Sequence, residues 1–396
     1  MRLCVISHKK HWLLNDKPVS NGGFVLEIDY WATMFDRILL CVPLHSDERP
    51  REGVYGYRMP DIEIAPLSPF RAKIPRRFVW RFRKTYRFVA NLLRFCKMLK
   101  AIRSCDAVCV RCPGPASLLG LLASILTKRK RCARYGANWF PQGKESITER
   151  RQKALLRSKW FKGPVFVQWY PDERITGVAV PMFGSTITED DIENSREAAA
   201  SRRLRPNPRL LFVGRLSREK NVDVILRGVE ILRTSLRVDV SLEICGDGDQ
   251  RKSLEAQANA LGIALAVTFH GMVPRADMCE YYSNADFLIL ASETEGWPKV
   301  AIEAMLYGLP CVGTAVGSVP YIIGENSERG LLWHVGKAEE MAQKLSGIIT
   351  DEDLYKTMST NARNWVEGKT LEVYRDQVKS VLEESWNCKL GRELIP

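Results

Sequence analysis

The chain has 396 residues, of which 45% are hydrophobic and 27% charged, and its formal net charge is +13 at pH 7. This composition excludes a disordered protein, and the length is too great for one ordinary core, which predicts two domains. No apolar run reaches the roughly 18 residues that span a bilayer, because the longest candidate covers only residues 116–126.

The N-terminus begins with the short apolar run RLCVIS, which is typical of a first strand and not of a signal peptide. Gly22 and Gly23 precede a helix that we expect to reach about Met34, and RILLCVPL, DAVCVR and RCARYG are later strands. From Ala65 to Cys105 there is no acidic residue and there are twelve Lys or Arg residues, so this stretch carries nearly the whole charge imbalance.

Eleven cysteines are scattered without a disulfide framework. Cys4, Cys41, Cys245 and Cys311 lie in apolar runs, which favours buried free thiols in a reducing cytosol. Residues 109–112 form one CxxC pair, but no second pair or histidine cluster completes a zinc site. We interpret the pair as strand and loop cysteines and predict no metal.

The second half repeats one device, an apolar strand followed by a glycine-containing loop or an amphipathic helix. The strands are RLLFVG, VSLEICGDG, AVTFHG, DFLILA, PCVGT and GLLW, with helices over 221–232, 253–261 and 278–282 and one that starts at Lys299. Such alternation is typical of a parallel sheet covered on both faces. We therefore predict an α/β fold of two Rossmann-like, doubly wound domains, joined in the polar stretch 186–208.

In open α/β sheets, ligands bind beyond the carboxyl ends of the strands, so the loops there are the candidate sites. After the first strand of the second half, Gly214 permits a tight turn and is followed by Arg215 and Lys220. Because Lys220 stands just before a helix, it predicts an anion site; the alternative is a solvated basic loop. In the next loop, Asp247 and Asp249 have the spacing of a metal–diphosphate site, but we favour a simple turn.

The loop after the third strand contains His270, a candidate ligand contact or a structural hydrogen-bonding residue. The backbone of Met272 and Val273 lies where a nucleobase edge is within reach.

After the fourth strand comes ASETEGWPKVAIEAMLYGLP, which places two carboxylates on either side of a turn. Glu295 stands at the mouth of the expected site, Gly296 lets the backbone approach a ligand, and Pro298 suits the start of a helix. Glu303 lies one turn into that helix, where a carboxylate accepts two hydroxyls of a ribose, while Glu295 accepts hydroxyls of a sugar. The alternative is a pair of surface glutamates, one of which favours the helix dipole.

Together these segments resemble the nucleotide-sugar domain of family 4 retaining glycosyltransferases, with Glu-x7-Glu at Glu295 and Glu303, over about residues 209–382. The resemblance implies the GT-B fold, in which two Rossmann-like domains face each other across a cleft. The implied boundaries are an acceptor-binding domain at 1–205, a nucleotide-sugar domain at 206–372 and a helix at 373–396 that crosses back.

The resemblance also implies roles. Arg215 and Lys220 hold the donor diphosphate, Glu295 the transferred sugar and Glu303 the ribose, and the catalytic residues are Arg215, Lys220 and Glu295. Gly22 and Gly23, in the loop after the first strand, match a glycine-rich loop near the phosphates. The implied donor-binding residues are Gly22, Gly23, Gly214, Arg215, Lys220, His270, Met272, Val273, Glu295, Gly296, Trp297, Pro298, Lys299, Val300 and Glu303.

One departure concerns the N-terminal domain, where many family members carry a histidine near the reacting sugar. No histidine stands between positions 45 and 270. Arg111, Asn138 and Trp139 are the candidates for that acceptor-side wall, with packing between the domains as the alternative for each. His8 and His11 follow the first strand and are either cleft residues or plain loop residues.

We expect retaining, metal-independent hexosyl transfer without a cofactor, from a UDP-sugar or else a GDP-sugar. The diphosphate leaving group then takes the proton of the incoming hydroxyl. The expected setting is polysaccharide or glycolipid assembly in the cytoplasm, at the inner face of the membrane. The alternatives are a small soluble acceptor, a nucleotide-sugar 2-epimerase and, more distantly, a nucleic-acid-binding protein, which the absence of any recognised motif disfavours.

The basic segment Phe70–Arg103 predicts contact with an anionic membrane and a lipid-linked acceptor. A helix is expected after Pro75, and apolar residues at helical spacing with basic residues between them are typical of an interfacial helix. The alternative is that the same apolar face packs on the N-terminal sheet. The apolar positions are Phe78, Phe82, Phe88, Leu92, Phe95, Leu99 and Ile102.

Overall fold

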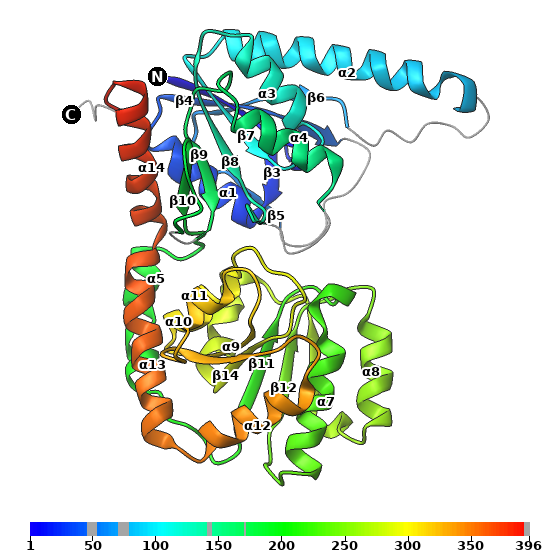
Figure 1. Cartoon of the computed structure of the whole chain (residues 1–396), viewed down its shortest axis with the longest axis vertical. Helices are drawn as coiled ribbons and strands as arrows, with labels where there is room; N and C mark the ends of the chain where they lie inside the picture. Colours follow the sequence, from blue (N-terminus) through cyan, green and yellow to red (C-terminus); the bar gives the residue numbers. More distant parts are fainter. Residues whose placement is uncertain (46–53, 70–78, 141–144, 170–171, 392–396) are drawn as a thin grey trace. The chain divides into compact units, whose positions relative to one another are not determined.

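The computed structural model describes the chain except for residues 46–53, 70–78, 141–144, 170–171 and 392–396. The chain divides into two compact units: Met1–Met182 with Tyr374–Pro396 form unit 1, and Phe183–Val373 form unit 2. Each unit has its own sheet and its own hydrophobic core (Figure 1).

Unit 1 contains a parallel sheet whose strand order reverses at its first strand. Strands β4 and β6 follow on one side of β1, and β7, β8, β9 and β10 on the other. This is the order of a doubly wound fold. The strands are β1 (Arg2–Ile6), β4 (Arg37–His45), β6 (Ile62–Leu67), β7 (Ala107–Cys112), β8 (Lys130–Tyr135), β9 (Val165–Gln168) and β10 (Ala179–Met182).

A hairpin that the sequence prediction missed extends this sheet. Strands β2 (His11–Leu14) and β3 (Lys17–Asn21) pair antiparallel, and β5 (Val54–Gly56) pairs with β3. The two turn residues, Asn15 and Asp16, have φ of 50° and 59°, the left-handed conformation that a two-residue hairpin turn requires.

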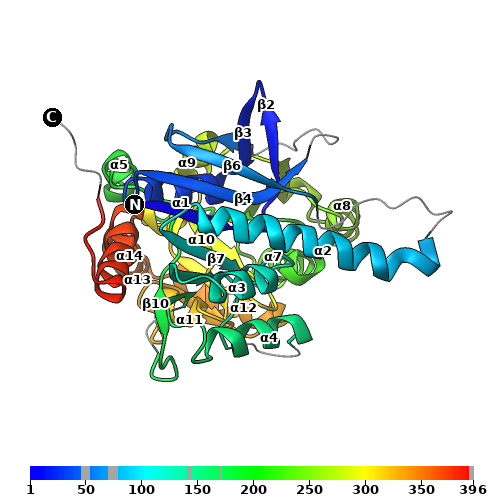
Figure 2. The same cartoon turned by 90° about the horizontal axis from the view of Figure 1, so that it is seen from above.

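Helices cover both faces of the unit 1 sheet, as a doubly wound topology requires. Helices α2 and α3 lie side by side, and α3 also packs on α4 (Figure 2). Helix α1 contacts the C-terminal helix α14, where the Tyr374 hydroxyl donates to Glu27. The helices are α1 (Gly22–Ala32), α2 (Val79–Arg103), α3 (Ser117–Ile125), α4 (Ile147–Leu156) and α14 (Leu371–Trp386).

The C-terminal part of helix α2 packs against the core of unit 1, whereas apolar residues nearer its N-terminus are exposed to solvent. Of the apolar face predicted from the sequence, Ile102 is fully buried, and Phe95 and Leu99 pack against the core. In contrast, Phe88 and Leu92 are 69% and 50% exposed, because the N-terminal part of the helix extends past the sheet (Figures 1 and 2). The predicted positions 70–78 lie outside the described residues.

Unit 2 is a six-stranded, fully parallel sheet in the order β13-β12-β11-β14-β15-β16, the strand order of the Rossmann fold. All six strands predicted for this half are present. They are β11 (Arg209–Val213), β12 (Ser241–Cys245), β13 (Val267–Gly271), β14 (Phe287–Leu290), β15 (Cys311–Thr314) and β16 (Gly330–Trp333).

The helices of unit 2 alternate with these strands, and α7 packs on both α8 and α12. Helix α7 buries Val222, Ile225, Leu226, Val229 and Leu232, a spacing of three and four residues that gives one apolar face. The helices are α5 (Glu189–Asn194), α6 (Arg196–Ala200), α7 (Val222–Thr234), α8 (Arg251–Ala260), α9 (Met278–Asn284), α10 (Lys299–Leu306), α11 (Val319–Ile323), α12 (Ala338–Ile349) and α13 (Glu352–Val366). Short 3-10 turns are η2 (Arg218–Lys220), η3 (Ala264–Ala266), η4 (Arg275–Asp277) and η5 (Glu367–Lys369).

Residues 183–205, which the sequence prediction assigned to the N-terminal domain, pack with unit 2. The reason is visible at Arg202, whose guanidinium donates to the carbonyl oxygens of Tyr307 at 2.6 Å and Tyr282 at 2.8 Å.

Two expectations from the sequence concern the state of the cysteines and the absence of membrane-spanning segments. Cys4, Cys41, Cys245 and Cys311 are buried free thiols, as predicted. Within the described residues, none of the helices combines the length and the apolar character that crossing a bilayer requires.

Candidate functional site

The strand order of unit 2 reverses between β11 and β14, so the loops that follow these two strands flank a switch point, where ligands of open α/β sheets bind. The first loop runs from Gly214 into the 3-10 turn η2, and the second runs from Ala291 to Pro298. Both loops were candidate sites from the sequence, and the topology places them next to each other.

A salt bridge joins the two loops. The Lys220 ammonium contacts Glu295 Oε1, and the Ser292 hydroxyl donates to the same oxygen at 2.8 Å. The two charged side chains are 23% and 13% exposed. A lysine and a carboxylate predicted to bind different parts of one ligand therefore lie in direct contact, partly shielded from water.

Close backbone packing fixes these loops, and glycines make it possible. A Cβ on Gly246 would lie 1.8 Å from the carbonyl oxygen of Gly214, and one on Gly248 would lie 2.2 Å from that of Leu216. Gly317 has a φ of 56°, and a Cβ there would lie 1.7 Å from the carbonyl oxygen of Glu295. A side chain at any of these positions would displace the site loops.

Asp247, in the loop after β12, takes part in this packing. The backbone N–H of Leu216 donates to the carbonyl oxygen of Asp247 at 3.0 Å, and Asp247 Oδ1 accepts from the N–H of Gly248 at 2.7 Å. These contacts support the interpretation as a turn. No group of three or more metal-ligating side chains occurs in the part of the chain that the structure describes.

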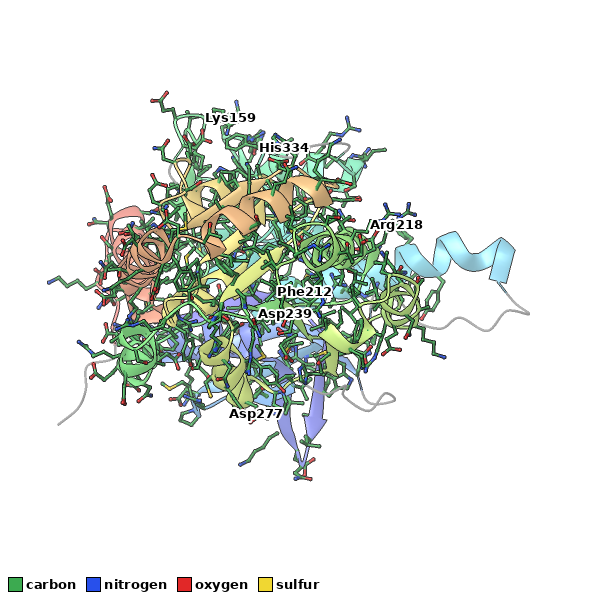
Figure 3. All side chains as sticks on the ribbon, turned by 90° about the horizontal axis from the view of Figure 1, so that it is seen from below. Lys159, Phe212, Arg218, Asp239, Asp277 and His334 are labelled. Carbon is green, nitrogen blue, oxygen red and sulfur yellow. The ribbon has the colours of Figure 1, made fainter. Side chains whose placement is uncertain are left out.

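Basic side chains at the mouth of the first loop are open to solvent. The Arg215 side chain is 76% exposed and lies 3.4 Å from Glu219. Arg218 is exposed as well and points outward (Figure 3). Of these three basic residues, only Lys220 has a side chain that is largely shielded from solvent.

Glu303 lies one turn into α10 and is held by side chains from two other segments. Glu303 Oε1 accepts from the Thr186 hydroxyl at 2.5 Å, and Oε2 accepts from the Tyr282 hydroxyl at 2.8 Å. The Arg275 guanidinium is 3.8 Å from Oε1. Sequence analysis missed Thr186, Tyr282 and Arg275, because nothing in their local patterns relates them to Glu303.

The remaining residues of the predicted donor set take different positions. The His270 imidazole contacts Glu243 and lies 3.4 Å from the Tyr281 hydroxyl, so its partners belong to β12 and α9. Met272 is 54% exposed directly after β13, whereas Trp297 is 7% exposed and packs 6.2 Å from the Tyr321 ring.

Three further residues of the predicted set lie at the start of α10. Pro298 is the N-cap of that helix, and Lys299 and Val300 form its first turn. Gly296 accepts a hydrogen bond from Ser318 at 2.5 Å, while Val273 is half-buried in the loop after β13.

In unit 1, Gly22 and Gly23 are the first residues of helix α1 and do not form a loop, and the hairpin β2–β3 separates them from β1. A Cβ on Gly22 would lie 2.7 Å from the Tyr55 ring, so this glycine makes room for β5 against the helix start.

Arg111 belongs to a buried ion network around a carboxylate that the sequence did not reveal. Its Nη2 donates to Glu27 Oε2 at 2.8 Å, while Arg134 contacts Glu27 Oε1 and the Tyr374 hydroxyl donates to that oxygen at 3.0 Å. Glu27 is only 3% exposed. The network ties α1, β7, β8 and α14 together.

The other two acceptor-side candidates follow β8. Trp139 is 2% exposed and packs edge-on at 5.2 Å from the Tyr135 ring. The carbonyl oxygens of Asn138 and Trp139 accept from the Lys153 ammonium at 3.0 Å and 2.8 Å.

His8 lies at the switch point of unit 1, directly after β1. A Cβ on Gly114, in the loop after β7, would lie 2.0 Å from His8 Nδ1, so the ring fills the space that the glycine leaves. Within the described residues, Nδ1 is buried without a hydrogen-bond partner. Burial, followed by the charges of Lys9 and Arg111, lowers the pKa of His8.

The two doubly wound α/β units are those of the GT-B fold. Solved structures share this fold along nearly the whole chain. The structure of Anabaena Alr3699/HepE in complex with UDP has a TM-score of 0.71 at 17% identity and covers 97% of this chain and 100% of its own. The lipopolysaccharide outer core galactosyltransferase WaaB has a TM-score of 0.67 at 16% identity, with coverage of 97% and 99%.

The sequence comparisons find similarity in the second half of the chain. Residues 194–365 match the family model described as Glycosyl transferases group 1. An uncharacterized glycosyltransferase of Haemophilus influenzae is 33% identical over 177 residues, 44% of this chain and 49% of its own length. The N-acetyl-alpha-D-glucosaminyl L-malate synthase of Bacillus anthracis is 28% identical over 186 residues, 46% of this chain and 48% of its own. The match thus spans about half the length of these relatives.

Proposed function

We propose that the protein transfers a sugar, with retention of configuration, from a nucleotide-diphosphate sugar to an acceptor hydroxyl. The observation that carries this proposal is the contact between Lys220 and Glu295 across the switch point of unit 2. One side chain suits a diphosphate and the other a sugar, and Glu303 provides a carboxylate for the ribose one turn into α10.

The reaction needs little covalent chemistry from the protein. The acceptor oxygen bonds to the anomeric carbon, the bond from that carbon to the diphosphate oxygen breaks, and the proton of the hydroxyl passes to the departing diphosphate. Lys220 and Arg215 stabilise the negative charge that grows on the diphosphate, and backbone N–H groups at the start of α10 add to this. Holding the donor and the acceptor hydroxyl in fixed positions lowers the activation barrier of the transfer further.

A UDP-sugar is the favoured donor, since the similar fold of HepE was crystallised with UDP. The test is a thermal-shift panel of UDP-, GDP-, ADP- and TDP-sugars, because a ligand that binds only the folded state raises the melting temperature by mass action. We expect one base to raise it and the others to leave it unchanged. The absence of a shift with every member at millimolar concentration would refute the proposal.

Hexosyl transfer to a lipid-linked acceptor at an anionic membrane is the favoured setting, in polysaccharide or glycolipid assembly. The outward part of α2 supports it. Tyr86, Phe88, Val89, Leu92 and Leu93 are 47–69% exposed, and the exposed Lys97, Lys100 and Arg103 follow along the same helix. Apolar residues beside basic ones are the composition of a helix that lies in a membrane surface.

Liposome co-sedimentation tests this setting. Wild type should sediment with anionic vesicles at low salt, and Leu92→Glu with Leu93→Glu should abolish it. The matched control is Leu265→Glu, at a fully exposed leucine of unit 2, which should sediment like wild type. If wild type stays in the supernatant, or if the α2 variant still sediments, the acceptor is soluble.

A further inference from the structure

Both oxygens of the Glu303 carboxylate accept a hydrogen bond from a hydroxyl group of unit 2. Oε1 accepts from Thr186 at 2.5 Å and Oε2 accepts from Tyr282 at 2.8 Å. Thr186 is 5% and Tyr282 3% exposed, while the Glu303 side chain is 22% exposed. The carboxylate is thus partly open to solvent, but both of its anchors are buried.

The two anchors are themselves held in place. The Tyr282 ring stacks on Tyr307 with centroids 5.7 Å apart and an angle of 20° between the planes. The Thr186 carbonyl oxygen accepts from the Arg275 guanidinium. Burial, followed by the charge of Glu303, raises the pKa of Tyr282 well above its usual value, so its hydroxyl stays protonated and donates. The Tyr282 hydroxyl is therefore a donor to Glu303 Oε2.

The remaining hydrogen-bonding capacity of Glu303 matches a diol. An ionised carboxylate has about four acceptor positions, and Thr186 and Tyr282 occupy two of them. Two positions remain, one on each oxygen, which suits two neighbouring hydroxyls that donate side by side. Without the anchors, rotation about the Glu303 side chain would spread these positions over several directions.

We propose that Tyr282 and Thr186 are positioning residues that orient Glu303 toward the two ribose hydroxyls of the donor nucleotide. This inference rests on the proposed function, in which Glu303 binds the ribose. The positioning role predicts that each residue affects the preference for ribose over deoxyribose. If either residue were only structural, its substitution would leave this preference unchanged.

The experiment measures the affinities of UDP and 2′-deoxy-UDP by titration calorimetry. Wild type should prefer UDP by about ten- to a hundredfold, the effect of one hydrogen bond to a charged group. Tyr282→Phe and Thr186→Val should each reduce this preference by about threefold or more. Thr186→Ser, which keeps the hydroxyl, should keep the preference of wild type. The matched control is Tyr281→Phe, because the neighbouring Tyr281 hydroxyl faces His270 at 3.4 Å and not Glu303.

Glu303→Gln separates the two levels of the proposal. If this variant keeps the preference for UDP, Glu303 does not bind the ribose, and the ribose assignment and the positioning role both fail. If it loses the preference while Tyr282→Phe and Thr186→Val keep it, only the positioning role fails. Circular dichroism establishes that each variant is folded. Because Thr186 and Tyr282 lie on different segments, each variant tests the positioning role of its own residue.

Discussion

Glu295→Gln should strengthen the binding of UDP while it slows sugar transfer. The Lys220 ammonium contacts Glu295, so a diphosphate that binds there must compete with this carboxylate for the lysine. A partly exposed pair is worth about 1 kcal/mol, and its removal should raise the affinity for UDP by about fivefold. Lys220→Ala removes a charge-assisted hydrogen bond of about 1.5–3 kcal/mol and should lower the affinity ten- to a hundredfold.

The assay combines calorimetry with UDP and the rate of UDP release from the sugar donor that the thermal-shift panel selects. Glu295→Gln should reduce the rate by about ten- to a hundredfold, because the sugar loses a hydrogen bond to a charged group. Glu293→Gln, at an exposed position of the same loop, is the matched control and should change neither quantity. The reasoning is wrong if Glu295→Gln weakens UDP binding as much as Lys220→Ala does.

Four further predictions concern metal, two glycines and pH. Transfer should survive EDTA, since basic side chains stabilise the leaving group; a loss that Mg²⁺ reverses would make Asp247 and Asp249 ligands. Gly317→Ala should lower the melting temperature and weaken UDP binding, because its φ is 56° and a Cβ would lie 1.7 Å from a carbonyl oxygen of the site loop. Gly347→Ala, where a Cβ meets open space, should stabilise helix α12 by about 0.5–1 kcal/mol. Burial lowers the pKa of His11 to about 4, below the unfolded value of about 6.5, so the unfolded state binds the proton first. Stability should fall as the pH drops through this window, by up to about 3 kcal/mol, and denaturant titrations of wild type and His11→Gln between pH 7 and 4 measure it. Equal slopes in both proteins would contradict the assignment.

Unit 2 was predictable from the sequence because its central strands are buried on both faces. A strand such as RLLFV is then a continuous apolar run, and the next glycine or polar residue marks the loop at the edge where ligands bind. The same rule placed Lys220 and Glu295 on adjacent loops, and the structure brings them into contact. In this half of the chain, the local sequence pattern and the strand order therefore both locate the loops of the candidate site.

Unit 1 was less predictable because its decisive contacts join residues that are far apart in the sequence. Glu27 binds Arg111, Arg134 and Tyr374, which are 84, 107 and 347 positions away. A buried glutamate within a helix has no local sign that distinguishes it from an exposed one. The hairpin β2–β3 did have a local sign, since Asn15 and Asp16 are typical turn residues.

The basic side chains of the unit 2 site differ in how closely they are paired with carboxylates, and under the proposed function this gives them different tasks. Lys220 is paired with Glu295, and Arg275 lies 3.8 Å from Glu303, so neither pair presents a full positive charge to an approaching donor. The Arg215 side chain is 76% exposed and lies 3.4 Å from Glu219, so its positive charge is much less compensated. Exposed charges of this kind act on encounter with an anionic ligand and are weakened by salt. In the proposed reaction, a partly buried lysine acts after binding, when the diphosphate replaces its carboxylate partner and the glutamate becomes available to the sugar. One exchange of partners at the switch point would then prepare both Lys220 and Glu295 for the proposed reaction.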